Sequence, residues 1–303
     1  MEFLLTLLGA TLRIATPILY GALGEMIVER AGILNLGIEG TMLLSAFGGF
    51  VAAQLSGSIY LGLIIAVAIG MLLSLLMGFL SITLGLNQHV SGLGITLFAS
   101  GLALFLFRII YGGESIPPAL EESFPQLRIF GGTILEPVFS QYVFTYAAFL
   151  LVPLLAWLLY RTSFGLRLRS VGENPEAADT AGISVFRTRY VALLMGGALM
   201  GLGGAFLSLA QLGAFTHGII NGRGWGAIAI VIFGNWRPWR VLAGALLFGG
   251  LQALQLRLQA EGVQLPYEIF LMLPYVMTIV AIAITGRNAS YPAALLKPYR
   301  REG

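Results

Sequence analysis

The sequence contains no cysteine, which excludes disulfides, thiolate metal sites and cysteine nucleophiles. Lysine and aspartate each occur once, as Lys297 and Asp179. Lys297 lies in a Leu-Leu-Lys-Pro stretch, so the chain lacks the lysine that follows the glycine-rich turn of a nucleotide-binding P-loop. Charged residues make up only 10% of the 303 positions, against about 25% in a soluble domain. A water-soluble globule of this size needs more charge to cover its surface.

Long apolar runs take the place of the missing charge. Hydrophobic residues make up 57% of the chain, and the mean hydropathy is +0.88. A membrane-spanning helix needs about 20 apolar residues. We therefore expect an all-α, polytopic membrane helix bundle of 8–10 transmembrane helices, with broken glycine-rich segments, in a single domain over 1–303. The preferred count is nine, with predicted spans Phe3–Leu23, Leu36–Leu55, Tyr60–Leu84, Gly92–Tyr111, Gln141–Tyr160, Tyr190–Leu212, Trp225–Phe233, Val241–Leu258 and Tyr267–Thr285.

The uneven placement of arginine predicts the topology. Segment 112–140 carries four prolines and four glutamates but one arginine, whereas 161–189 carries five arginines. Cytoplasmic loops collect Lys and Arg, so we expect 112–140 to be external, and 161–189 and the basic tail 286–303 to be cytoplasmic. The first 23 residues lack a basic leader and a cleavage site, so they are expected to remain as a membrane helix. Nine spans would place the N-terminus outside; eight or ten would place it inside.

A first polar segment lies between the first two predicted spans. It contains Asn35 and Glu39 among glycines that allow a helix to break and expose backbone groups to a cavity. A carboxylate within an apolar span is a candidate functional group because it is costly to bury. The alternative is that Glu39 pairs with Arg30 at the cytoplasmic interface, and the sequence favours neither interpretation.

Two further polar patches interrupt apolar runs. Asn87 and Gln88 lie in a stretch without Lys or Arg, unlike an ordinary cytoplasmic loop. Asn221 and Trp225 lie in a glycine-broken stretch of the second half, at a position comparable to Asn35–Gly40 in the first half. Matching broken segments in two halves indicate an internal repeat with a substrate path at its interface. Trp225 could stack on a ring or anchor the membrane interface. No metal site is expected, since the chain has only two histidines.

The basic loop contains a complete set of signals for a short helix. Asn174 suits the N-cap, Pro175 the first turn, Glu176 and Asp179 the positive helix end, and Gly182 the C-terminal stop. A rigid helix of this kind suits docking to a soluble partner, with small alanines lying flush in a groove; an inert connector is the alternative. The candidate docking residues are Glu173, Asn174, Pro175, Glu176, Ala177, Ala178, Thr180, Gly182 and Ile183.

This loop resembles the coupling-helix loop of ABC importer permeases in the branched-chain amino acid, ribose and nucleoside superfamily. Asn35-Leu-Gly-Ile-Glu-Gly resembles the early signature of that family, and Arg30-Ala-Gly-Ile-Leu-Asn is similar to its nucleoside branch, which depends on basic membrane lipoproteins. The resemblance spans essentially the whole chain. It implies a partner ATPase, a second permease and an external or periplasmic substrate-binding lipoprotein, with this chain as the shorter of two paired permeases.

The resemblance implies a multi-pass inner-membrane permease subunit that imports nucleosides or related ribosides and leaves ATP hydrolysis to another chain. Neither a cofactor nor a nucleic-acid partner is expected, and lipids surround the spans. The candidate path residues are Asn35, Glu39, Asn87, Gln88, Asn221 and Trp225. One alternative is an ABC permease for simple sugars. Another is a self-sufficient secondary transporter, which would need a titratable group such as Glu39 in mid-membrane. An intramembrane enzyme has only a serine site left open, because paired aspartates, zincin motifs and thiols are absent from the sequence.

Overall fold

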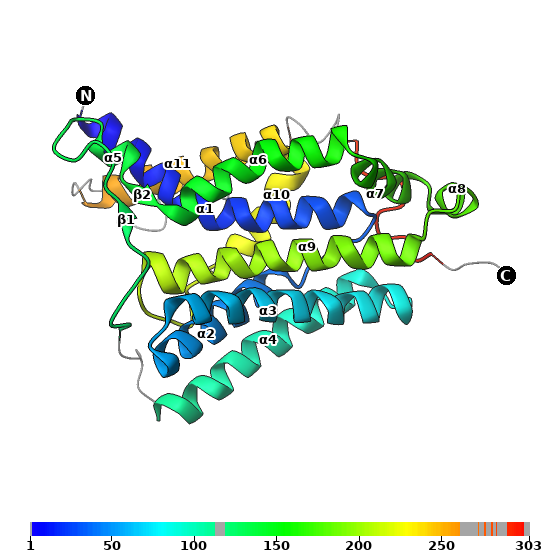
Figure 1. Ribbon diagram of the computed structural model, residues 1–303, viewed down its shortest axis with the longest axis horizontal. Coiled ribbons are helices and arrows are strands. Elements are labelled where there is room, and N and C mark those ends of the chain that lie inside the picture. The colour runs from blue at the N-terminus through cyan, green and yellow to red at the C-terminus, as the bar shows by residue number, and fades with distance from the viewer. Residues whose placement is uncertain are drawn as a thin grey trace.

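The computed structural model describes residues 2–112, 119–260 and 290–299, together with residues 272, 276, 280 and 283. Figure 1 shows a bundle of long helices that run roughly side by side. The ninth predicted span, 267–285, lies outside the described residues apart from four isolated positions.

Seven described helices are long and apolar enough to cross a membrane. An eighth, α10 (Arg223–Phe233), has 11 residues and would extend only about 16 Å. These eight correspond to the first eight predicted spans. The seven long helices are α1 (Glu2–Arg30), α2 (Ile38–Ser56), α3 (Ile59–Gly78) continued by η1 (Phe79–Thr83), α4 (Gln88–Tyr111), α6 (Val143–Arg161), α9 (Val185–Ala205) continued by η2 (Phe206–Gln211), and α11 (Pro238–Ala260).

Short elements connect the long helices at their ends. Strands β1 (Gln126–Leu127) and β2 (Gln141–Tyr142) form an antiparallel pair, with α5 (Glu136–Phe139) between them. Helices α7 (Ser163–Glu173) and α8 (Pro175–Thr180) lie between α6 and α9. The prediction of an all-α bundle is therefore confirmed, with one two-residue strand pair as its described β structure.

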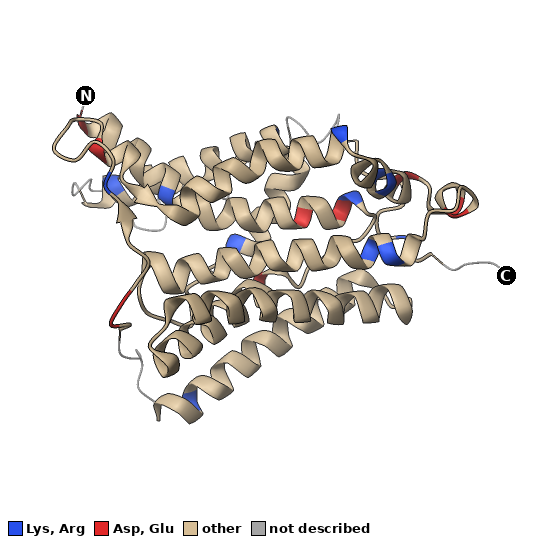
Figure 2. Ribbon diagram, in the orientation of Figure 1, with Lys and Arg blue, Asp and Glu red and all other residues tan. Residues whose placement is uncertain are grey.

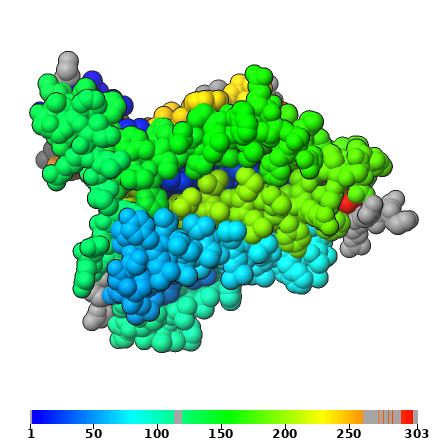
Figure 3. All heavy atoms as spheres, in the orientation of Figure 1, coloured from blue at the N-terminus to red at the C-terminus, as the bar shows by residue number. Residues whose placement is uncertain are grey.

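Helix α1 is the centre of the bundle. Almost every residue from Ile14 to Glu29 is buried, and α1 packs against α9, α10 and α11. The packing is close because small residues face each other: a Cβ added to Gly24 would lie 2.7 Å from the carbonyl oxygen of Gly196. In Figure 3, only a strip of α1 is visible between α6 and α9. The segment from Ile14 to Glu29 has no lipid-facing stripe, so its polar residues face protein, whereas the first two turns of α1 are largely exposed.

The charged residues gather at the two ends of the bundle, with few between them (Figure 2). The start of α1 lies beside the 119–142 loop, since the Gln141 side chain donates a hydrogen bond to the carbonyl of Gly9 at 3.2 Å. At the other end, the N–H of Ala294 donates to the carbonyl of Gly172 at 2.9 Å. The N-terminus and the predicted external loop therefore share one end, as nine spans require, and the basic loop and tail share the other. Which end faces the cytoplasm stays a prediction from arginine placement.

Candidate functional site

The chain between α1 and α2 is a non-helical break held by side chains. Gly32 has φ of +87°, a backbone conformation that favours glycine. The N–H of Asn35 donates to a carboxylate oxygen of Glu25 at 2.8 Å, and the Asn35 side-chain oxygen accepts from the N–H of Gly37 at 3.0 Å. The N–H of Leu34 donates to the side-chain oxygen of Gln88 at 2.8 Å. The side chains therefore supply acceptors that a continuous helix would have provided.

This break lies well inside the bundle. The Asn35 side-chain nitrogen is 3.8 Å from the sulfur of Met200, which is near the middle of the continuous α9–η2 helix. Both Asn35 and Gln88 are buried. Irregular backbone at membrane depth is stable only where protein or a polar cavity satisfies it. Asn35 and Gln88 thus stabilise the break, and their contact with a substrate stays a prediction.

Glu39 joins the start of α2 to the start of α10. One carboxylate oxygen accepts the N–H of Gly222 at 2.8 Å, and the other accepts the N–H of Gly224 at 2.7 Å. A carboxylate at a helix N-terminus satisfies free N–H groups and complements the positive helix end. Glu39 does not pair with Arg30, whose guanidinium donates to the carbonyl of Trp236 at 3.0 and 3.1 Å.

Close approach at this junction requires glycine. A Cβ added to Gly224 would lie 2.7 Å from both the Cα and a carboxylate oxygen of Glu39. By contrast, a Cβ added to Gly226, half a turn further along α10, would meet only an edge of Phe248 at 3.8 Å. The two glycine-broken segments that the sequence pairs across its halves therefore meet at Glu39.

The link between η2 and α10, residues 212–222, is held in the bundle by a buried aromatic side chain. Phe215 is fully buried, and its ring centroid lies 5.1 Å from that of Phe47 and 6.0 Å from that of Phe107. Asn221 ends the link with φ of +49°, which asparagine tolerates better than most residues. The Asn221 side chain is exposed, and Trp225 on the first turn of α10 is 38% exposed.

Asn87 lies apart from this junction, at the start of α4. Its side-chain oxygen caps the helix by accepting the N–H groups of His89 and Val90 at 2.9 and 3.2 Å. Asn87 also lines an open groove of about 530 Å³ whose other lining residues are mostly apolar and include Leu86 and Phe98. The structure thus brings Glu39 together with the α10 start, and Gln88 with the 31–37 break. It gives no contact between Asn87 and Asn221.

A pair of buried acidic residues that the sequence predictions did not include lies beside the break. Glu25 and Glu29 lie one turn apart on α1 and are fully buried. Glu29 accepts the indole N–H of Trp236 at 2.5 Å, which ties α1 to the turn between α10 and α11. Arg189 of α9 is also buried and donates to the carbonyl of Ala31 at 3.2 Å. The available signal was two acids four residues apart within an otherwise apolar span.

At the basic end, the short helix predicted between Asn174 and Gly182 is present as α8. The Asn174 side-chain oxygen accepts the N–H of Ala177 at 3.0 Å, and Pro175 is the first helical residue. Gly182 has φ of +81°, and the N–H of Ile183 donates back to the carbonyl of Ala178 at 2.9 Å. A glycine with positive φ, followed by an N–H that donates back into the last turn, is a common C-terminal cap of an α-helix. The sequence did not predict α7, which precedes α8 and shares Asn174 as its boundary.

The two alanines of α8 differ in exposure. Ala178 is buried in a small core with Val171 and Val185, and Ile183 packs against that core. Ala177 is exposed, as are Glu173 and Glu176. The expectation that both alanines lie flush against a partner needs correction, because Ala178 already packs within its own chain. Thr180 and Gly182 are exposed as well.

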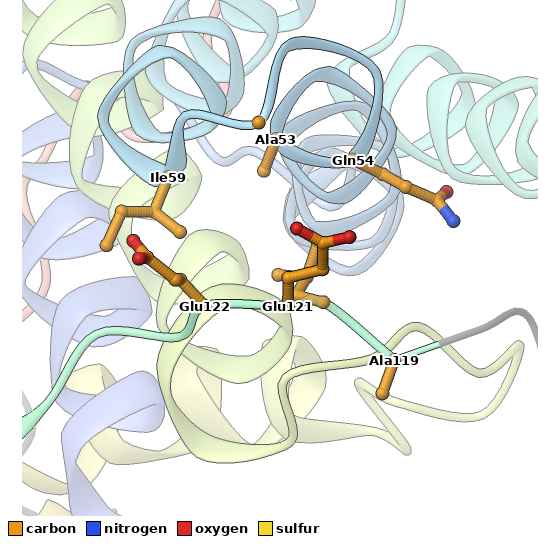
Figure 4. A pocket seen from close by; sticks show the side chains of 8 residues that line it. Ala53, Gln54, Ile59, Ala119, Glu121 and Glu122 are labelled. Atoms are coloured by element: carbon orange, nitrogen blue, oxygen red, sulfur yellow. The ribbon is translucent and has the colours of Figure 1, made fainter.

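A cavity of about 410 Å³ lies at the opposite end, between the α2–α3 turn and residues 119–122. Figure 4 shows Glu121 and Glu122 extending toward Ala53 and Ile59. It is remote from the Glu39 junction and the basic loop. Within the described ranges, no three His, Asp or Glu side chains gather as metal ligands.

The whole chain resembles known permease subunits. It is 41% identical to "Putative glucose ABC transporter permease protein TsgC13" of Haloferax volcanii, over 100% of this chain and 99% of that protein. It is 36% identical to "Guanosine ABC transporter permease protein NupQ" of Bacillus subtilis, over 99% and 98%. A second Bacillus subtilis protein, "Guanosine ABC transporter permease protein NupP", is 26% identical over 93% and 81%.

The fold has a solved counterpart, described as "An inward-facing conformation of a putative metal-chelate type ABC transporter". The TM-score is 0.52 at 17% identity, over 93% of this chain and 85% of the other. A family model for the branched-chain amino acid transport system / permease component matches residues 7–282. These relatives are permease subunits of ABC transporters, in which ATP hydrolysis resides in a separate subunit. The chain therefore belongs to the family of branched-chain amino acid transport system / permease components, as a multi-pass plasma-membrane permease subunit of an ABC transporter.

Proposed function

We propose that this chain is one of two permeases in an importer for nucleosides or related ribosides. Support comes from the two guanosine permease proteins among its relatives. Simple sugars are the second candidate substrate class, favoured by the name of the 41% identical Haloferax protein. A riboside carries both a base and a sugar ring, so a path built for it differs from a sugar path by having to accept an aromatic base.

The observation that carries the coupling part of the proposal is that hydrogen bonds cap both ends of α8. A short helix capped at both ends and seated on the Val171–Ala178–Val185 core moves as one body with α7 and α9. A partner ATPase that pushes on its exposed side, formed by Glu173, Glu176 and Ala177, would therefore displace the long helices. The tail braces the same unit, since Ala293 and Ala294 bond to Glu173 and Gly172.

We place the substrate path beside the junction of α2 and α10. Glu39 fixes the start of α10. The exposed Asn221 precedes this start in the sequence, and the exposed Trp225 lies in the first turn of α10. A half-length helix beginning inside a bundle leaves its first turn available to line a polar route. Trp225 could then stack on a nucleobase, whose planar face suits an indole ring.

The second permease would pack against α4. Among the seven long described helices, α4 buries the smallest share of its apolar stretch. Gly94 and Gly101 on its outer side have open space where a Cβ would be. Small residues on an exposed apolar helix permit close helix–helix approach in a membrane. The groove lined by Asn87 would then lie between the two subunits.

The external lipoprotein would dock at the opposite end, over the 119–142 loop and the cavity that contains Glu121 and Glu122. These carboxylates are exposed and could pair with basic groups on the docking protein.

The substrate is tested with the complete transporter in proteoliposomes, supplied with ATP and the binding lipoprotein. Guanosine uptake that is competed by other nucleosides and not by glucose is expected. Glucose uptake without guanosine uptake would instead establish the sugar transporter. Uptake of either compound without the ATPase would contradict the whole proposal.

The docking surface is tested separately by Ala177→Arg. Ala177 is exposed, so the variant should fold and insert normally, yet it should lose the ATPase on purification and lose uptake. Arg187→Ala, an exposed change on the other side of the same loop, is the control. If Ala177→Arg retains the ATPase and uptake, α8 is only a connector.

A further inference from the structure

A second polar site lies on the side of the bundle, at the basic end. An open cavity of about 720 Å³ is bounded by α6, α7 and the turn between α10 and α11. Five arginines from different parts of the chain line it, and none of the described aspartates or glutamates does. The arginines are Arg30, Arg161, Arg169, Arg237 and Arg240.

Most of this positive charge has no carboxylate partner among the described residues, where none of the five arginines forms an ion pair. Arg30 donates to the carbonyl of Trp236 and to the Tyr160 hydroxyl, neither of which is charged. The guanidinium of Arg169 lies 5.1 Å from the centre of the Tyr160 ring, and its Nε is buried without a hydrogen-bond partner. Arg161 and Arg240 are exposed. A cluster of this kind without counter-charges is a site for an anion.

The start of α11 adds to the positive potential. This 23-residue helix begins at Pro238, beside Arg237 and Arg240, so the positive end of its dipole lies at the same region. The arginines and the helix end together suit a phosphate group.

Two observations place the site at a membrane surface. Trp157 and Trp239 line the cavity and are 57% and 58% exposed, unusual for so large an apolar ring unless it meets lipid headgroups. Leu150 and Leu154 precede Trp157 and Arg161 at spacings that put all four on one face of α6. Both leucines are exposed, at 70% and 50%. An apolar strip therefore leads away from the arginine cluster along the bundle.

We propose that this cavity binds the phosphodiester headgroup of an anionic phospholipid, with an acyl chain lying along Leu154 and Leu150. Free phosphate shares the headgroup chemistry but has no use for the tryptophans and the apolar strip. Through Arg169 of α7 and Arg240 of α11, the bound lipid would tie the coupling loop to the α10–α11 turn. The inference rests on membrane insertion and is independent of which substrate is carried.

The test uses the assembled transporter, with lipids counted by native mass spectrometry. The cavity variant, Arg161→Gln/Arg240→Gln, removes two exposed arginines that line the cavity. The control variant, Arg167→Gln/Arg187→Gln, removes two exposed arginines of segment 161–189 that do not line it. The cavity variant should bind phosphatidylglycerol about 25-fold more weakly, taking about fivefold per arginine. The control should bind as the parent does, and phosphatidylcholine binding should not change. Equal phosphatidylglycerol binding by both variants would overturn the proposal.

Additional variants and ligands distinguish lipid binding from misfolding, free-anion binding and protein docking. Arg161→Lys/Arg240→Lys should recover most of the binding, which excludes misfolding as the cause of its loss. Leu154→Ser should weaken the lipid severalfold with the arginines intact. Displacement of the lipid by inorganic phosphate alone would reassign the cavity to free anions. Loss of the ATPase from the Gln variant but not from its control would reassign it to protein docking.

Discussion

Two helices in this chain begin on side-chain caps that come from very different distances in the sequence. Helix α8 is capped by Asn174, the residue immediately before it, and this cap is exposed to solvent. Helix α10 is capped by Glu39, which is 183 residues from Gly222 and lies inside the bundle. The chemistry is the same in both places, since an oxygen accepts free N–H groups of a first turn.

The two caps differ in what would happen without them. Water can replace the Asn174 side chain, so the local cap mainly biases a short helix toward one conformation. Around Glu39, the N–H groups of Gly222 and Gly224 would lose their acceptor within an apolar bundle, where an unmade hydrogen bond is costly. The distant cap therefore holds the fold of the candidate path, and the local cap holds the shape of the candidate docking surface.

The largest effect is expected from Glu39→Ala. Two N–H groups lose their acceptor, at about 1–3 kcal/mol each, so the thermal unfolding temperature of the purified transporter should fall markedly and uptake should stop. Glu39→Gln keeps one acceptor oxygen and should lose less stability. If Glu39→Ala melts like the parent, the carboxylate does not hold α10.

Gly224→Ala should come next. The new methyl group would meet the backbone and carboxylate of Glu39, and overpacking of this kind costs about 1–3 kcal/mol. Gly226→Ala on the same helix has room for its methyl group and serves as the matched control. Thermal melts of the two variants should differ clearly; equal melting temperatures would show that the α2–α10 contact yields easily.

Asn174→Ala should destabilise α8 by about 1 kcal/mol while the membrane bundle remains intact. We expect normal expression and a normal melting temperature, but weaker ATPase co-purification and weaker coupling of ATP hydrolysis to uptake. Asn174→Asp keeps a capping oxygen and should behave as the parent does. If the Asn174→Ala transporter couples ATP hydrolysis to uptake as well as the parent does, the cap of α8 is not needed for coupling.

The smallest change in stability is expected at Asn221. Asn221→Gly removes the carboxamide but tolerates the positive φ, so stability should change by less than about 1 kcal/mol. Severalfold slower guanosine uptake by this variant would support a path role for the side chain. Unchanged uptake would remove Asn221 from the path, and Asn221→Leu would then report only backbone strain.

The apolar runs of the sequence predicted the seven long helices and α10 because a membrane helix satisfies its own backbone and needs only a local stretch of apolar residues. The separation of arginine-rich and arginine-poor loops likewise predicted which segments share an end. Helix α8 was predictable from Asn174, Pro175 and Gly182 because caps and stops act within a few residues.

Contacts that depend on where distant helices cross could be found only in three dimensions. The sequence singled out Glu39 but could not show that it caps α10 instead of pairing with Arg30, because both partners are compatible with its local pattern. Ala177 and Ala178 are identical residues, and only the packing of α8 on Val171 and Val185 decides that one is buried. The sequence by itself determined the membrane spans, which loops are rich in arginine, and helix α8, because each of these features depends on residues that are neighbours in the chain. Tertiary packing decided which polar groups contact each other, because these residues lie far apart in the chain and no local sequence pattern links them.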